Sequence, residues 1–409
     1  MANQSNLLRT KQVPAHFWAY ALLSLALGGF VLVNWRNGRL GMADFRVYFD
    51  AAGTLLDGGS PYGRSFGLSS GYYKYAPVAL LPWMLLQSLG WAISSTLYLV
   101  VMFSTMVAWV PKFVPYAHRL LSDHNVHLSR PRWWAVVLFA LLTLQHLSRE
   151  LLLGNVNWFL LVGVAVWWKA IRKPKHEPKQ AVWTGALLAV ICVFKPHFAI
   201  LLPWVGWRRP VRFLAWTLAW GVTLLLLPSL WLGLEANAAL LMGWAGALLN
   251  HNTATITSFN AISGVFGLAN SGTFRVVMPG LAVGLLSLWI SRVRVVVRCQ
   301  ESLEVMVLVG VIPSLVLTDT EHFMWSFPLL AWWCLLLTSR SFWHRVPSWD
   351  RTLTTLLFAT FIVPYSFASP DLWGQQIGRY LEHGGPIGVS NLFLVIGTIW
   401  MHYVYRTSD

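Results

Sequence analysis

Residues 16–34 read HFWAYALLSLALGGFVLVN and decide the fold, because they form an apolar run long enough to cross a bilayer. Similar runs recur along all 409 residues, and the chain is 56% hydrophobic with only 11% charged residues. Soluble domains carry about a quarter charged residues. The composition therefore predicts an all-α polytopic membrane protein with no room for a large soluble domain. No cleavage site of small residues follows Phe17–Val33, so we expect the first helix to be retained.

The apolar segments predict about 12 transmembrane helices in a single transmembrane domain, residues 1–409. The segments are 16–34, 94–111, 133–148, 156–170, 181–195, 197–207, 212–234, 275–292, 303–318, 322–338, 352–368 and 389–405. The pair 181–195 and 197–207 meets at Lys195-Pro196, which leaves open a tight hairpin of short helices.

One further apolar run, Ala76–Leu89, is short and is interrupted by Pro77 and Pro82. If it crossed the membrane, the basic loops would be divided between the two sides. If it does not cross, the basic loops all lie on the same side. Because Lys and Arg in short loops mark the cytoplasmic side, we predict a juxtamembrane helix on the outer face. Both termini are then cytoplasmic, and the outer loops are 35–93, 235–274 and 369–388.

The net charge of +15 follows from this arrangement and does not indicate a nucleic-acid partner. The expected partners are membrane lipids. The three cysteines lie in or beside apolar segments and provide neither a disulfide framework nor a metal site. No nucleotide-binding fingerprint or His/Cys metal spacing is present, so we expect no cofactor and no metal.

Asp44 emerges on the outer side shortly after the first apolar segment, in the run Asp44-Phe45-Arg46-Val47-Tyr48. A carboxylate at the water–lipid boundary is a candidate general base. Asp44 and Tyr48 are four residues apart and share a helix face, whereas Arg46 points elsewhere. The alternative is that Asp44 caps the N-terminus of this helix.

Other polar residues gather at predicted outer ends of apolar segments. Asn155 and Asn157 follow Arg149-Glu150, a pair for which anchoring at the interface or an ion pair are the simpler roles. Lys195 precedes a proline at a segment end, where a lysine either snorkels to the interface or binds a phosphate. Ionisable groups at such positions mark functional sites, and this applies to the pair Glu321-His322.

The motifs together resemble the bacterial membrane mannosyltransferases of glycosyltransferase family 87. The resemblance rests, in order, on Asp44-Phe45-Arg46-Val47-Tyr48, Gly58-Gly59-Ser60-Pro61-Tyr62, Tyr73-Lys74-Tyr75-Ala76-Pro77, Gly154-Asn155-Val156-Asn157, Lys195-Pro196 and His322. Departures from the family pattern include Ala76 before Pro77 and Asn155 after Gly154, and the loop 250–260 matches poorly.

The resemblance implies a C-type glycosyltransferase fold in a bacterial cytoplasmic membrane, with Asp44 as the base at an active site on the outer face. It also implies a polyprenyl-phosphate sugar donor, with mannose as the sugar, and a lipid or glycan acceptor. We expect inversion, with Lys195 and His322 at the donor phosphate and Arg46 or Arg275 as a third cation. The further substrate-binding candidates are Tyr48, Glu321, Asn155, Asn157 and His251.

Two alternatives remain open at the level of sequence. A transporter or flippase of lipid-linked sugars explains the many spans, although it would favour internal repeats and broken mid-membrane helices, which the sequence does not show. A surface-polysaccharide polymerase or ligase would depend on Arg149, Arg275 and His251 more than on Asp44.

Overall fold

The structure is a computed structural model that describes residues 15–66, 71–122, 133–172, 178–250, 298–315, 320–339, 343–344, 348–383 and 385–407. The predicted segment 275–292 and the candidate residues His251 and Arg275 lie outside these ranges.

The described residues are almost entirely helical, and their only β-structure is an isolated bridge between Ser65 and Tyr72. The N-terminal half contains α1 (Ala15–Arg36), α2 (Ala43–Leu56), η1 (Pro77–Leu80), α3 (Leu81–Gln87), α4 (Gly90–Trp109), η2 (Val110–Lys112), α5 (Phe113–Ser122), α6 (Trp133–Leu153), α7 (Asn157–Ile171) and α8 (Pro178–Phe194). The remainder contains η3 (Pro196–Ile200), α9 (Leu201–Arg208), α10 (Val211–Leu226), α11 (Ser229–Leu232), α12 (Leu234–Asn250), α15 (Arg298–Leu315), η4 (Thr320–Ser326), α16 (Phe327–Thr338), α18 (Ser348–Phe367), α19 (Pro370–His383) and α20 (Pro386–Thr407). An all-helical membrane protein is therefore confirmed.

The predicted count of about 12 spans is not supported. Among the described residues, four helices are long and apolar enough to cross a membrane, and a bent pair makes a possible fifth. The four are Phe17–Arg36, Gly90–Arg119, Trp133–Leu153 and Val211–Leu232, and the pair is Arg351–Phe367 with Pro370–Glu382. Some of the other apolar segments form helices shorter than a span: α7 has 15 residues, and at about 1.5 Å per residue it falls short of the roughly 30 Å of a hydrocarbon core.

The apolar run beginning at Ala76 forms η1 and α3, and Pro77 and Pro82 each stand in the first turn of one of these helices. Proline is favoured there because the first N–H groups of a helix have no partner within the helix. The run is too short to meet the length of a span, as predicted. Its position on the outer interface stays a prediction.

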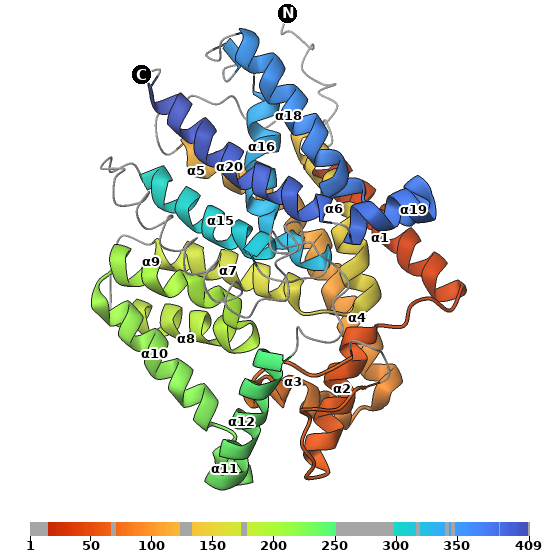
Figure 1. The fold of residues 1–409 in the computed structure, drawn as a ribbon, viewed down its shortest axis with the longest axis vertical. Helices are drawn as coiled ribbons and strands as arrows, with labels where there is room; N and C mark the ends of the chain where they lie inside the picture. Colours follow the sequence, from red (N-terminus) through yellow and green to blue (C-terminus); the bar gives the residue numbers. More distant parts are fainter. Residues whose placement is uncertain are drawn as a thin grey trace, which may run out of the picture.

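The helices pack in distinct groups (Figure 1). Helices α8, α9 and α10 pack together at one side, α2 and α3 lie side by side at the lower end beside α12, and α18 packs along α20 at the opposite end. Helices α6, α16 and η4 join these groups through the core. The elements that carry the candidate residues, α2, the α6–α7 turn, the end of α8 and η4, therefore come from different groups.

Ion pairs connect α9 to α15 at the end of α9 that carries two arginines. Glu304 is fully buried and accepts hydrogen bonds from Trp204 Nε1 at 2.8 Å and from Arg208 Nη2 at 2.5 Å. Arg209 binds Glu301 at 2.6 Å. A buried carboxylate is tolerated only when it is paired and hydrogen-bonded, and here Arg208 and Trp204 satisfy Glu304. These two basic residues therefore also hold the fold together.

Candidate functional site

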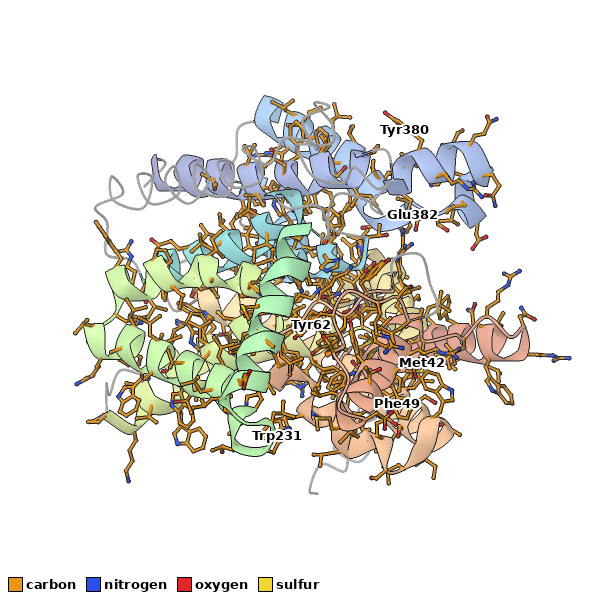
Figure 2. The ribbon with its side chains drawn as sticks, turned by 60° about the horizontal axis from the view of Figure 1, so that its bottom comes forward. Met42, Phe49, Tyr62, Trp231, Tyr380 and Glu382 are labelled. Carbon is orange, nitrogen blue, oxygen red and sulfur yellow. The ribbon has the colours of Figure 1, made fainter. Side chains whose placement is uncertain are left out.

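The start of α2 is held against the α6–α7 turn by unusual backbone geometry. Met42, labelled in Figure 2, has left-handed angles of φ 43° and ψ 52°, and its N–H donates to Leu152 O at 3.0 Å. Gly154 also has a positive φ of 67°, and a Cβ there would lie 2.8 Å from Cβ of Phe45. A strained non-glycine residue persists only where its surroundings enforce it, and such residues gather at functional sites. This contact brings Asp44, in the first turn of α2, to the α6–α7 turn.

Replacing Gly154 with alanine is expected to destabilise the protein by at least about 1–2 kcal/mol, the usual cost of a left-handed L-residue, and to separate α2 from the turn. The control is Gly163→Ala, because a Cβ there would meet Ile191 at an ordinary 3.5 Å. Thermal unfolding can be followed by a thiol-reactive dye that reaches the buried Cys334 only on unfolding. Equal midpoints for the two variants would contradict this account.

Asn155 connects Asp44 to Tyr48. Its Nδ2 donates to Asp44 Oδ2 at 2.5 Å, while its Oδ1 accepts the Tyr48 hydroxyl at 3.1 Å and the Val156 N–H at 2.7 Å. The two donors on Oδ1 fix the orientation of the amide, so its N–H₂ faces the carboxylate. Asp44 and Tyr48 thus lie on one face of α2, as their spacing predicted. The side chain of Asn155 holds these two residues in place, and its contact with substrate stays a prediction.

Asp44 is not the N-cap of α2, because Met42 occupies that position and the helix has no side-chain capping bond. The alternative that Asp44 serves only to cap this helix is therefore wrong. Arg46 is exposed, lies 3.5 Å from Asp50 and stacks over Trp91 with 5.9 Å to the ring centroid. The structure therefore does not bring Arg46 to Asp44.

Tyr75 extends this hydrogen-bond chain from Tyr48. The two hydroxyls lie 3.0 Å apart, and since Tyr48 gives its single proton to Asn155, Tyr75 is the donor between them. Tyr62 donates to the Tyr75 carbonyl at 2.8 Å, and Trp244 Nε1 to the Lys74 carbonyl at 3.1 Å, so the segment that presents Tyr75 is tied down from two sides. Burial, together with the neighbouring Tyr75 and the Asp44 carboxylate, raises the pKa of Tyr48 well above its usual value. Tyr48 therefore remains a neutral hydrogen-bond donor.

Lys195 and His322, 127 residues apart, are in direct contact. Lys195 Nζ lies 2.8 Å from His322 Nε2, and both side chains are buried. The ammonium group donates, so Nε2 of the imidazole must be unprotonated and its proton lies on Nδ1, 3.7 Å from Glu321 Oε1. Lys195 Nζ also lies over the rings of Tyr75, at 5.2 Å, and Trp325, at 5.8 Å. Tyr75 thus connects the Asp44 cluster to the Lys195–His322 pair.

The backbone explains why Lys195 projects here. Helix α8 ends at Phe194, and Lys195 adopts extended angles of φ −136° and ψ 97° before Pro196 begins η3. A residue before proline is pushed out of the helical region, so the break follows directly from the sequence.

The charges around Lys195 come from both clusters. Burial, followed by the nearby Lys74, lowers the pKa of Lys195 to about 8, and the carboxylates of Glu321, Asp44 and Glu150 oppose that shift. Because Coulomb interactions weaken with distance, these opposing effects indicate that the three carboxylates lie in the neighbourhood of Lys195. The site has both a carboxylate that can accept a proton and a cation that can hold an anion.

Arg149 binds two carboxylates from the C-terminal half of the chain. Its Nε donates to Glu321 Oε2 at 3.3 Å, and its Nη1 donates to Glu382. Both carboxylates are buried, at 2% and 7% exposure. The sequence left open an ion pair at Arg149-Glu150. Arg149 does form ion pairs, but with Glu321 and Glu382, which lie far away in the sequence.

Glu150 and Asn157 have structural roles in the described geometry. Glu150 accepts the Trp158 N–H at 2.8 Å and the Asn157 Nδ2 at 3.3 Å across the α6–α7 turn. A carboxylate that receives N–H groups from the first turn of a helix stabilises that helix. Asn157 is fully buried and donates through its Nδ2 to Glu150, and its contact with substrate stays a prediction.

An apolar groove lies elsewhere, between α5, α7 and α15, and is lined by Phe113, Tyr116, Leu161, Trp168, Met306 and Val309 among others. None of the candidate site residues lines it. Within the parts of the chain that the structure describes, no group of three His, Cys, Asp or Glu side chains converges in a way that could hold a metal.

Comparison with known protein families identifies the family of this chain. The sequence model of glycosyltransferase family 87 matches residues 73–318, which is more than half of the chain and includes Lys195 and the Asn155 turn. The chain belongs to glycosyltransferase family 87. Neither the curated proteins nor the solved structures provide a match. The resemblance inferred from the sequence is therefore confirmed, and this family 87 protein is a glycosyltransferase with a sugar donor and an acceptor as partners.

Two features of the glycosyltransferase site were missed from the sequence. Tyr75 stands in a motif that the sequence analysis quoted, but its role as a bridge depends on contacts with Tyr48 and Lys195. Glu382 lies in the predicted outer loop 369–388, and no local sequence signal connects it to Arg149. His251 and Arg275 lie outside the described residues, so their contribution to the site stays a prediction.

Proposed function

We propose that this glycosyltransferase moves a sugar, with mannose as the specific case, from a polyprenyl-phosphate donor to a hydroxyl of a lipid or glycan acceptor. The reaction takes place on the outer face of a bacterial cytoplasmic membrane, with Asp44 at the boundary between water and lipid. The observation that carries the proposal is the joining of two clusters, Asp44–Asn155–Tyr48 and Lys195–His322, through the single residue Tyr75.

The chemistry follows from these groups. Asp44 takes the proton of the acceptor hydroxyl while the hydroxyl oxygen forms a bond to the anomeric carbon. The bond from that carbon to the phosphate oxygen breaks, and its electron pair leaves with the polyprenyl phosphate. Attack on the side opposite the departing phosphate inverts the anomeric centre. Because the leaving group keeps its negative charge, a fixed cation lowers the barrier to its departure, and Lys195 with His322 provides that cation.

Support for a lipid-linked donor comes from the environment of the cation. Lys195 is buried among Tyr75 and Trp325 and carries its charge on a point-like ammonium group, which suits a phosphate monoester or diester at an apolar boundary. The segment Val211–Leu232, whose helix α10 packs on α8 beside Lys195, is long and apolar enough to cross a membrane.

The test is transfer of radiolabelled sugar in proteoliposomes supplied with either polyprenyl-phosphate mannose or a nucleotide sugar. Labelled acceptor formed only with the polyprenyl-phosphate donor, with the opposite anomeric configuration, is the expected result. Transfer from the nucleotide sugar alone, or retention of configuration, would overturn the proposed donor or mechanism.

Donor binding is expected to weaken as the pH rises above about 8, because burial lowers the pKa of Lys195 to about 8 in the empty site. Below that pH the amine is charged and can bind the phosphate. Above that pH the amine is neutral, and binding is weakened by the free energy needed to protonate it. KM for the donor, measured from pH 6.5 to 9.5, should rise on the alkaline side. In Lys195→Arg the rise should disappear, because a guanidinium stays charged over this range. A wild-type KM that stays constant across the range would contradict a role for this charge.

A further inference from the structure

Helix α19 leaves the bundle at a sharp angle. Helix α18 ends at Phe367, and the chain bends by 103° before α19 begins at Pro370. A second break at Gly374, with φ 78° and ψ 167°, separates Pro370–Trp373 from Gln375–His383. Gly378 packs so closely on Pro370 that it leaves no room for a Cβ. The segment 375–383 is thereby fixed as an arm nearly perpendicular to α18, visible at the right of Figure 1.

The arm exposes apolar side chains and buries a carboxylate. At 100° per residue, Ile377 and Tyr380 fall on one side and Glu382 on the other, while Leu381 is partly buried against the core. Ile377 is 57% exposed and Tyr380 is 64% exposed, whereas Glu382 is 7% exposed. Figure 2 shows Tyr380 at the outer edge of the arm and Glu382 on the side nearer the other helices.

The ion pair with Arg149 explains why Glu382 faces the protein. Glu382 reaches Arg149, which also holds Glu321 beside His322. An arm attached through a buried ion pair cannot rotate to hide its apolar side without breaking that pair. The apolar side must therefore meet its partner outside the chain.

We propose that the arm, residues 375–383, docks on the phospholipid surface, with Ile377 and Tyr380 directed toward the acyl chains. The bend places it across the direction of α18, as expected of a helix in the plane of the headgroups. Leu372 and Trp373, which are 65% and 44% exposed, extend the same apolar surface before the break. Tyrosine and tryptophan are enriched at this depth of a bilayer. The partner is the lipid bilayer itself, and the inference does not depend on which sugar or donor the enzyme uses.

The test places a single environment-sensitive fluorophore on either side of the arm, through Ile377→Cys or Gln375→Cys. Cys192 and Cys299 are replaced by alanine, while Cys334 is buried and stays. The parent chain without an added cysteine gives the background. The protein is reconstituted in vesicles of phosphatidylethanolamine and phosphatidylglycerol, and quenching by a nitroxide lipid is compared with quenching by iodide.

Docking on lipid predicts that the nitroxide lipid quenches the label at position 377 severalfold more than the label at 375, and that iodide shows the reverse order. Gln375 is the matched control because it is exposed on the same helix and lies on the opposite side. Equal quenching at both positions would overturn the proposal. Protection of position 377 from both quenchers would also overturn it, since it would place a protein partner, such as a second copy of this chain, on the arm.

Discussion

Replacing Asp44 with asparagine is expected to lower turnover by about 10²–10⁴-fold, the usual contribution of a positioned general base. The amide cannot accept the proton of the acceptor hydroxyl, yet it is similar in size and can still hydrogen-bond with Asn155. The fold, the α2 contact at Gly154 and donor binding should therefore survive. The measurement is the single-turnover rate of sugar transfer, together with donor affinity and the thermal midpoint.

The control for this variant is Asp50→Asn. Asp50 lies on the same helix and pairs with the exposed Arg46, away from Asn155. Its loss should change activity far less than the loss of Asp44, because an exposed ion pair contributes at most about 1 kcal/mol to stability. Turnover of Asp44→Asn at the wild-type rate would remove the central claim about the base.

Replacing Lys195 with alanine is expected to reduce donor affinity and the rate of phosphate departure together by about 10–100-fold, since a charge-assisted hydrogen bond contributes roughly 1.5–3 kcal/mol. Lys195→Arg should lose less, because it keeps the charge although its planar group fits the contact with His322 less well. His322→Ala should lose activity and lose the ordered contact with Lys195 as well. The readout is KM for the donor and kcat for each variant.

Lys112→Ala is the matched control, because Lys112 is an exposed cation stacked over Trp109. It should behave like the wild type. Full activity of both Lys195→Ala and His322→Ala at normal expression would eliminate the phosphate site while leaving the role of Asp44 open.

Local patterns predicted the parts of the site that depend on nearby residues. The spacing of Asp44 and Tyr48 predicted a shared helix face, and both side chains meet Asn155. The proline after Lys195 predicted a helix end, and α8 stops one residue earlier. Such features follow from the helical repeat and from steric limits on the residue before proline.

Features that depend on packing between distant segments could not be predicted from the sequence. The direction of Arg46 was predicted, but its pairing with the exposed Asp50 was not, and its role as a third cation stays a prediction. The count of about 12 spans is not supported by the described residues, because hydropathy registers apolar residues whether they face lipid or a protein core. Most residues of α16 are buried by neighbouring helices, so its apolar sequence reflects packing as well as any contact with membrane.

The dispersal of the site along the chain bears on how the enzyme is made in the cell. Asp44, Asn155, Lys195, His322 and Glu382 come from five separate segments, and the contact between Arg149 and Glu382 spans 233 positions. Because a membrane protein is inserted from its N-terminus as the ribosome synthesises it, Asp44 is made long before Lys195 and His322. A ribosome-stalled chain that ends before η4 should lack the Lys195–His322 contact, and we expect it to transfer no sugar. On the proposed mechanism, synthesis of η4 is thus the step that completes the site.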